Sequence, residues 1–405
     1  MKGKRRDAVR RTVFFGLASL IAVGCEDVTR VTRPPQLAAP AADVTAGVTA
    51  AGAQVVSWTV ASPMHKARAF FASAQLLNGN VLVAGGFDGT INGPPNVAES
   101  EIYDWHAGTW MVVSAMNQAR SAPVALRLED GRVMVIGGFD AFFNVLASAE
   151  IYDPRSNTWS LTAAMNDARV EDFTAVLLPG RKVLVAGGTA SDGVTSLSSA
   201  EIFDETTGTW SRTGSMNVAR GEFATAVLHD GRVLATGGFA TDLTPIAAAE
   251  IYDPVTGVWT RTENMHTARA DHAAVRLLDG QVLVAGGKTL GDVPLTAAEI
   301  FDPRSGRWTP TSDMTSPHSE IELVGVLLPD GKVLVAGGFA GVDTPQSGAD
   351  LYDPRTGTWT QAGFMSDARA GHAAVVLPGN RGVLVMGGLR QPPAATASVD
   401  VGRTH

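Results

Sequence analysis

The chain has 405 residues, of which 45% are apolar, 18% are charged and 44 are glycine, and its formal net charge is −8. Six basic residues and one acid lie in the first 24 positions, so the remainder carries about −13 and has no basic cluster, which excludes a typical nucleic-acid-binding protein. The apolar content provides for a sizeable core, and the glycine and β-branched bias favours strands over helices.

The N-terminus has the pattern of an export signal. Basic residues between Lys2 and Arg11 precede an apolar run, Val13 to Val23, which is too short to span a bilayer as a helix. The run ends at Gly24 and Cys25, the single cysteine of the chain. This resembles a bacterial lipoprotein signal, although Ala22 stands where leucine is usual. An ordinary secretory signal with an incidental cysteine is the alternative.

The resemblance implies that residues 1–24 are removed and that Cys25 is lipidated. Residues 25–52 are rich in Ala, Thr, Val and Pro without periodicity, and we expect a flexible tether there. Glu26 follows the cysteine, where aspartate would favour retention in the inner membrane, so the outer membrane of the cell envelope is the expected location. A lone cysteine forms no internal disulfide. We expect a monomer that meets the membrane through its lipid anchor only.

From residue 53 to 402 the chain consists of seven copies of one pattern about 50 residues long. Each copy has a Val-rich run that ends in two glycines, where the missing Cβ allows a positive φ or the close approach of another backbone. A period this steady indicates a repeat architecture. The glycine pairs are Gly85 and Gly86, Gly137 and Gly138, Gly187 and Gly188, Gly237 and Gly238, Gly286 and Gly287, Gly337 and Gly338, and Gly387 and Gly388. The tryptophans in step with them are Trp58, Trp110, Trp159, Trp210, Trp259, Trp308 and Trp359.

One copy shows the strands that the pattern predicts. Arg269 to Leu278 is a first strand, Asp279-Gly280 is a hairpin turn, and Val282 to Gly287 is a second strand. A third strand follows from Ala297 to Pro303 and a short fourth from Arg307 to Pro310. Four antiparallel strands per copy predict one blade of a β-propeller. We interpret the repeated tryptophans and methionines as core that fills the gaps between neighbouring blades.

A glycine pair after an apolar strand, then Glu and Tyr-Asp-Pro, then Gly-x-Trp, resembles the kelch repeat. The resemblance covers about Val55 to Val401 and implies an all-β, seven-bladed propeller. The last copy has a third strand near Ala397 to Val401 and no tryptophan strand after it, whereas Val55 to Val60 has no preceding blade. We therefore expect the N-terminal strand to complete the last blade as its outermost strand.

Before each first strand stands a repeated arginine, replaced once by His318. A residue repeated in six copies is more typical of a structural bond than of catalysis, and we expect these arginines to tie one blade to the next through backbone carbonyls or the repeated third-strand acid. These residues are Arg68, Arg120, Arg169, Arg220, Arg269 and Arg369.

Two residues after each arginine the copies differ, and four consecutive copies have an acid. We expect these carboxylates at the mouth of the propeller channel, where they raise one another's pKa or bind a cation; salt bridges to the nearby arginines are the equal alternative. The kelch resemblance implies ligand contacts here and at the residue after the glycine pair. Phenylalanines there suit a basic peptide or a sugar ring, although filling the loops is their commoner role. The candidates are Glu171, Asp172, Glu222, Asp271, Glu320, Phe87, Phe139, Phe239 and Phe339.

Leu328 to Gly338 is similar to segments of galactose and glyoxal oxidase propellers, whose copper site needs a cysteine cross-linked to tyrosine. Cys25 lies outside the repeats, which excludes that copper chemistry. The sequence has no close-spaced pair of histidines that would predict a zinc site. We expect a module that binds a protein or a glycan without a cofactor. The alternative is an epimerase or lyase of the sialic-acid type that uses the channel-mouth acids and neighbouring arginines.

Overall fold

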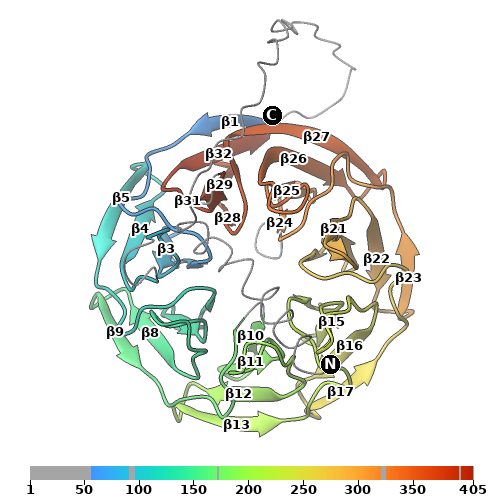
Figure 1. Ribbon diagram of the computed structural model, residues 1–405, viewed down its shortest axis with the longest axis horizontal. Helices are drawn as coiled ribbons and strands as arrows, with labels where there is room; N and C mark the ends of the chain where they lie inside the picture. Colours follow the sequence, from blue (N-terminus) through green and yellow to red (C-terminus); the bar gives the residue numbers. More distant parts are fainter. Residues whose placement is uncertain (1–55, 91–95, 171–172, 321–324, 392–393, 405) are drawn as a thin grey trace, which may run out of the picture. The chain divides into compact units, whose positions relative to one another are not determined.

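The computed structural model describes residues 56–90, 96–170, 173–320, 325–391 and 394–404. They form seven four-stranded antiparallel sheets arranged as the blades of a ring (Figure 1), which confirms the predicted all-β, seven-bladed propeller. None of the described residues forms a helix long and apolar enough to cross a membrane. The predicted signal peptide, Cys25 and the tether lie outside the described residues, as do Glu171 and Asp172.

In each blade the first strand is innermost and the fourth outermost (Figure 1). The first strands are β2 (Ala72–Gln75), β6 (Val124–Arg127), β10 (Thr174–Leu178), β14 (Ala224–Val227), β18 (Ala273–Arg276), β24 (Gly325–Leu327) and β28 (Ala373–Val376). The second strands are β3 (Val81–Ala84), β7 (Val133–Ile136), β11 (Lys182–Ala186), β15 (Val233–Thr236), β19 (Val282–Ala285), β25 (Val333–Ala336) and β29 (Val383–Met386).

The third strands are β4 (Ser100–Asp104), β8 (Ala149–Asp153), β12 (Ala200–Asp204), β16 (Ala249–Asp253), β22 (Ala298–Asp302), β26 (Gln346–Asp353) and β32 (Val399–Thr404). The fourth strands are β5 (Thr109–Val113), β9 (Thr158–Leu161), β13 (Thr209–Thr213), β17 (Val258–Arg261), β23 (Arg307–Pro310), β27 (Thr358–Arg369) and β1 (Val56–Val60). Two small hairpins, β20 (Lys288–Thr289) with β21 (Val293–Pro294) and β30 (Leu389–Arg390) with β31 (Ala394–Ala395), lie in the loops of blades 5 and 7.

The antiparallel order gives the ring two different faces. Hairpins between first and second strands and between third and fourth strands lie on one, which we call the hairpin face. The loops after the glycine pairs and the junctions between blades lie on the other, which we call the loop face. The strands of the fifth blade follow the prediction closely, with β23 at Arg307–Pro310 as expected. Its first strand begins at Ala273 because the chain before it, from Arg269, forms the junction with the preceding blade.

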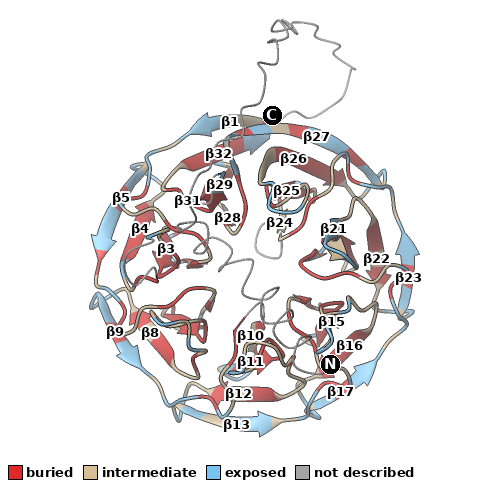
Figure 2. Cartoon of the chain, viewed as in Figure 1, coloured by how far each residue is buried: buried red, intermediate tan, exposed pale blue. Residues whose placement is uncertain are grey.

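The repeated aromatic and methionine residues are core, as predicted. Each fourth-strand tryptophan from Trp110 to Trp359 stacks on a tyrosine or phenylalanine of the third strand, with ring centroids 4.9–5.1 Å apart. The seven methionines at the blade junctions are only 3–5% exposed. One apolar cluster joins Leu82 and Met116 to Val133 and Trp159, and so spans blades 1 and 2. Figure 2 shows the third strands largely buried and the outermost strands largely exposed.

The seventh blade combines both ends of the described chain. Its strands lie in the order β1, β32, β29, β28, and β1 pairs with β32 from Val56 opposite Thr404 to Val60 opposite Asp400. The indole Nε1 of Trp58 donates to the carbonyl of Ala362 in blade 6 at 2.9 Å. The third strand begins at Val399, two residues later than the sequence pattern indicates.

Candidate functional site

The repeated arginines hold their own blades together at the loop face. In blade 4, Nη1 of Arg220 donates to the carbonyls of Gly237 at 2.8 Å and Ala248 at 2.9 Å, and Nη2 donates to Oε1 of Glu250 at 2.8 Å. The side chains of Arg220 and Glu250 are both fully buried. The predicted partners, backbone carbonyls and the third-strand acid, are confirmed, but the expectation that these side chains tie one blade to the next is wrong, because they bond within their own blade. The pairs are Arg68–Glu101, Arg120–Glu150, Arg169–Glu201, Arg220–Glu250, Arg269–Glu299 and Arg369–Asp400.

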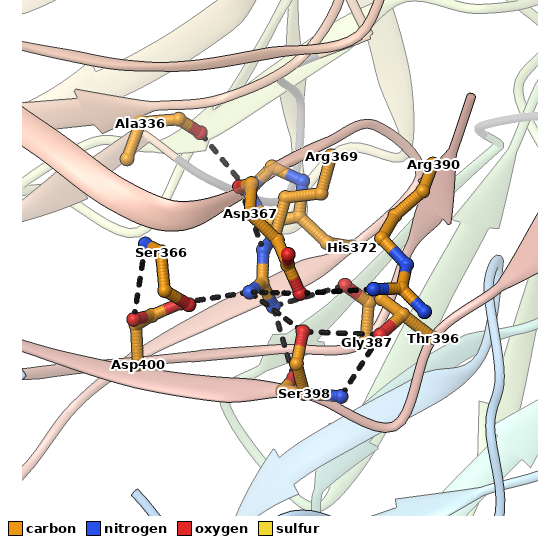
Figure 3. Close-up of polar contacts among 10 residues, drawn as sticks. All are labelled: Ala336, Ser366, Asp367, Arg369, His372, Gly387, Arg390, Thr396, Ser398 and Asp400. Atoms are coloured by element: carbon orange, nitrogen blue, oxygen red, sulfur yellow. Dashed lines mark hydrogen bonds and ion pairs between the residues drawn. The ribbon is translucent and has the colours of Figure 1, made fainter. Parts of the chain in front are cut away.

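We call each such set of bonds, from the arginine to two carbonyls and to the third-strand acid, a bracket. Blades 6 and 7 keep the bracket with different residues. Figure 3 shows Arg369 of blade 7, which donates to the carbonyls of Gly387 and Ser398 and, at 2.7 Å, to the shorter acid Asp400. In blade 6, His318 replaces the arginine, and its Nδ1 lies 2.7 Å from the carbonyl of Gly337. Its Nε2 lies 3.4 Å from Asp350, so a shorter base also meets a shorter acid.

The glycine pairs connect each blade to the next. The backbone N–H of Gly238 in blade 4 donates to the carbonyl of Arg269 in blade 5 at 2.9 Å. Gly237 has a φ of +58°, and a Cβ on it would lie 2.3 Å from that carbonyl oxygen, so only glycine fits. We call these bonds the glycine–arginine ring. Its donors and acceptors are Gly86 to Arg120, Gly138 to Arg169, Gly188 to Arg220, Gly238 to Arg269, Gly287 to His318, Gly338 to Arg369 and Gly388 to Arg68.

The variable residues two positions after each arginine form a second circle on the loop face. We call them the inner ring; its described members are Phe70, Ala122, Glu222, Asp271, Glu320 and Gly371, whose φ values lie between +49° and +57°. Backbone bonds link neighbouring members, since Ala122 N donates to Phe70 O, Phe70 N to Gly371 O and Asp271 N to Glu222 O. Left-handed backbone at non-glycine residues is strained, and such strain is concentrated at functional sites.

The residues after the glycine pairs lie beside this inner ring. Backbone bridges pair Gly221 with Phe239 and Ala270 with Lys288, and Glu222 and Asp271 directly follow Gly221 and Ala270. The structure therefore brings the two predicted sets of variable positions together. Phe87 is buried, whereas Phe139, Phe239 and Phe339 are half-buried.

Lys288 is the cation among the inner-ring acids. Its Nζ lies 2.5 Å from Asp271, 3.6 Å from Glu222 and 3.9 Å from Asp292, and 5.3 Å from the centroid of the Phe239 ring. Burial alone would lower the pKa of Lys288, but the carboxylates of Asp271, Glu222 and Glu320 outweigh it and raise that pKa well above its usual value. The ammonium group is therefore always charged near neutral pH.

This arrangement corrects the alternative of salt bridges to the neighbouring arginines. Arg220 and Arg269 are bound to Glu250 and Glu299 in their own blades and have no exposed side-chain surface. Lys288 takes their place as the partner of the acids. Sequence reasoning missed it, although one signal was present: it is the charged residue at a position where the other copies have Phe, Thr or Leu.

The inner ring has an acidic side and an apolar side. Glu222, Asp271 and Glu320 belong to blades 4, 5 and 6, whereas Gly371, Phe70 and Ala122 belong to blades 7, 1 and 2. Phe70 covers Gly371, because a Cβ on Gly371 would lie 2.5 Å from the Phe70 ring. Counted over Glu222, Asp271, Glu320 and Lys288, the acidic side retains a net negative charge.

A comparison with protein families finds the Kelch motif at residues 130–166, 173–217, 220–266, 269–315 and 323–365, more than half of the chain. The chain belongs to the kelch family. A comparison with curated protein sequences finds no significant match.

Among solved structures, this kelch propeller is similar to a fungal alcohol oxidase of the AA5 family in complex with copper. The TM-score is 0.70 at 18% identity over 86% of this chain and 76% of that one. It is also similar to YjhT, with a TM-score of 0.57 at 15% identity over 75% of this chain and 99% of that one. At identities this low, the structural similarity shows a shared fold alone.

The copper of the oxidase does not fit the residues described here. The four tyrosines are only 1–4% exposed and stack on tryptophans inside the blades. Within the described ranges, no group of three or more His, Cys, Asp or Glu side chains could hold a metal ion. Arg220 and Arg269, two of the arginines that the epimerase alternative would use, have no exposed side-chain surface and are bound to Glu250 and Glu299.

Proposed function

We propose that this kelch propeller is a protein-interaction module whose inner ring binds a cationic side chain of its partner. The kelch propeller fold itself is typical of interaction modules. The observation that carries the finer proposal is the environment of Lys288, whose ammonium group lies between carboxylates and over the face of Phe239. The acidic side is thus already built to hold one ammonium group.

The charge and position of the acids support a second cation from outside. Among the described residues, the carboxylates of Glu222, Asp271 and Glu320 outnumber the ammonium group of Lys288, so the acidic side attracts positive charge from a distance. Glu222 and Glu320 are half-buried at the loop face, whereas Asp271 is 1% exposed and serves Lys288. Half-buried acids in a partly desolvated setting interact more strongly with a cation than fully solvated ones. The apolar side with Phe70 suits an aliphatic or aromatic neighbour of that cation.

The test uses the full chain and a fluorescently labelled tetralysine peptide, with binding followed by fluorescence anisotropy. The double variant Glu222→Gln/Glu320→Gln is expected to weaken binding about tenfold or more, because each charged hydrogen bond contributes about 1.5–3 kcal/mol. The matched control, Glu129→Gln/Asp279→Asn, removes the same charge at exposed hairpin-face turns and is expected to change affinity less than about twofold.

Equal loss in both double variants would show that only overall charge matters and would overturn the proposal. A neutral oligosaccharide that binds the wild type and loses affinity in the inner-ring variant would assign the ring to glycans instead. Asp271 is left unchanged in this test, because its replacement would also disturb buried Lys288.

The proposed location is the bacterial cell envelope, with the propeller exported and tethered by a lipid on Cys25. The support is the basic segment, the short apolar run and Gly24-Cys25 at the N-terminus. Labelling cells with palmitate, with and without globomycin, tests this location. The expected result is a labelled protein whose processing globomycin blocks, and an unlabelled protein would contradict it. A Cys25→Ser variant is the control.

A further inference from the structure

The hairpin face is the face at which the N-terminal part of the chain joins the propeller. In blades 1 to 6 a hairpin on this face connects the third strand to the fourth. Blade 7 has no such hairpin, because its third strand, β32, and its fourth, β1, come from opposite ends of the chain. Val56, where β1 begins, pairs with Thr404, where β32 ends, so both residues lie at the edge of the hairpin face (Figure 1).

A lipid on Cys25 would hold this edge near a bilayer. About 30 residues separate Cys25 from Val56, and the ends of a flexible chain of that length lie on the order of 30 Å apart. The proposed anchor therefore keeps the propeller close to the membrane surface without fixing which face turns toward it. The surface chemistry of the two faces decides the orientation.

The two faces of the ring differ strongly in charge. The bracket residues pair with one another and are left aside, and every other charged residue belongs to the face of its strand end, hairpin or loop. On the hairpin face thirteen lysines and arginines then stand with twelve acids. On the loop face the described residues include five lysines and arginines and fourteen acids. An anionic surface is therefore repelled by the loop face and not by the hairpin face.

Exposed arginines stand at the outer hairpins of the hairpin face. Arg155, Arg304 and Arg355 each follow a proline at the same turn position, in blades 2, 5 and 6, and all three are exposed. The aspartate before each proline is half-buried and accepts a hydrogen bond from the backbone N–H of the arginine at 2.8–2.9 Å. The Arg355 guanidinium also lies 3.1 Å from Asp353, yet its side chain is 78% exposed and that of the acid 22%. The cations are thus the more exposed partners in these hairpins.

Exposed aliphatic residues lie on the same face. Leu77 and Leu278, in the hairpins between the first and second strands of blades 1 and 5, are 66% and 71% exposed. Val255, in the outer hairpin of blade 4, is 92% exposed. Pro179 and Pro329 hold the position of Leu77 in blades 3 and 6 and are exposed as well. Aliphatic and arginine side chains on one face suit the headgroup region of a bilayer, which takes up apolar side chains and offers phosphates to guanidinium groups.

We propose that the hairpin face docks on a bilayer that carries anionic lipids, an inference that rests on the proposed lipid anchor at Cys25. The loop face, with its inner ring, then faces away from the membrane and stays open to the cationic side chain of a partner. The excess of acids on the loop face is kept apart from the anionic headgroups. Docking adds a second contact to the lipid, and stable attachment of a lipidated protein usually takes two such signals.

The test couples Cys25 of the full chain to a maleimide lipid in vesicles of phosphatidylglycerol and phosphatidylcholine in equal parts. This supplies the anchor whether or not the cell attaches one. Hydroxyl-radical footprinting then compares the oxidation of side chains in the coupled and the free protein. Leu77 and Leu278 are expected to be oxidised severalfold more slowly in the coupled protein. Phe142 and Val342, 80% and 69% exposed on the loop face, are expected to react as in the free protein.

The double variant Arg155→Gln/Arg304→Gln is expected to lose this protection, since each arginine at an anionic surface contributes about fivefold to binding. The matched control, Arg212→Gln/Arg261→Gln, removes the same charge from exposed positions at the loop-face ends of two outer strands and is expected to keep the protection.

Protection of Phe142 and Val342 in place of the two leucines would overturn the proposal, and so would equal oxidation of both faces. Loss of protection in both double variants would do the same, because overall charge would then account for the docking. Palmitate labelling tests the natural anchor separately, so a missing anchor and a wrong orientation give different results.

Discussion

The glycine–arginine ring and the inner ring lie two residues apart in the chain and follow opposite rules. Every blade contributes an arginine or a histidine to the first, with its side chain fully buried and bound to an acid. In the second, the same backbone conformation holds Phe, Ala, Glu, Asp or Gly. The difference shows that the fold constrains the backbone at the inner ring and lets the side chain there vary.

The buried brackets also explain why the acids of the inner ring need a cation of their own. Each arginine already has three acceptors in its blade, as Arg220 has in Gly237, Ala248 and Glu250. The cation that pairs with Glu222 and Asp271 is Lys288 from the next loop. The arginines that hold each blade together and the lysine that faces the inner-ring acids are therefore different residues.

Deletion of β1 tests whether the glycine–arginine ring alone can hold blades 7 and 1 together. Without Val56 to Val60 the blades still share the bond from Gly388 to Arg68, but β32 becomes an open edge. We expect a loss of 3–5 kcal/mol or more, on the order of a lost buried aromatic side chain, measured by thermal and urea unfolding. An unchanged Tm would show that the outer strand does not close the ring.

Breaking one bracket is expected to cost nearly as much. Arg220→Ala leaves Glu250 buried without its cation, which typically costs about 3–5 kcal/mol in urea unfolding. The control is Arg212→Ala, because Arg212 is 56% exposed in its pair with Asp167, and such pairs contribute about 0–1 kcal/mol. Similar losses in the two variants would contradict the structural role of the bracket.

Two buried histidines beside the inner ring make stability depend on pH. Burial, aided by the charge of Arg369, lowers the pKa of His372 to about 3, and burial likewise lowers the pKa of His272 well below its usual value. Below the unfolded pKa of about 6.5 the unfolded chain binds protons that the folded chain does not. This stability is therefore complete above pH 6.5 and declines as the pH falls, by about 1.4 kcal/mol per pH unit for each histidine.

His372→Phe isolates this effect. Other blades have a phenylalanine at this position, namely Phe71, Phe173 and Phe223. Like His372, each lies against the first glycine of the pair in the preceding blade. Between pH 6.5 and pH 5 the wild type should lose about 2 kcal/mol more than the variant in urea unfolding. Most carboxyl groups have pKa values below this pH range and therefore stay ionised within it. Parallel curves for the two proteins would mean that the pKa of His372 is the same in the folded and the unfolded chain.

Exchanging residues within the inner ring should have the smallest effects. Gly371→Ala places a Cβ on left-handed backbone and against Phe70, and is expected to cost about 1–2 kcal/mol. Ala122→Gly relieves the same strain and should stabilise by about 0.5–1 kcal/mol, as measured by urea unfolding. Opposite signs for the two changes support a shared backbone requirement, and equal signs would refute it.

The fold was predictable because the same sequence pattern recurs in each blade. The glycine pairs and the tryptophans recur in seven copies and the Asp-Gly hairpin turn of Asp279-Gly280 in four, so a departure in one copy does not obscure the pattern. The structure confirms the strand order predicted for the fifth copy, including its fourth strand at Arg307–Pro310. The start of β32 was less certain because the last copy departs from the pattern there.

The site was harder to predict because it depends on exceptions. A repeat identifies which positions vary, and so it indicated Glu222, Asp271 and Phe239 correctly as neighbours of the loop face. It could not show that Lys288 reaches back to these acids, since that contact depends on the conformation of one loop.

Each junction of the glycine–arginine ring is divided between two blades, one giving the donor glycine and the next the acceptor carbonyl. A blade duplicated in the gene would therefore bring an acceptor carbonyl for the blade before it and a donor glycine for the blade after it. For the same reason the ring of bonds does not depend on which blade comes first in the chain. New chain ends placed in a hairpin such as Asp130-Gly131 would cut none of these bonds, which makes the propeller a natural subject for circular permutation.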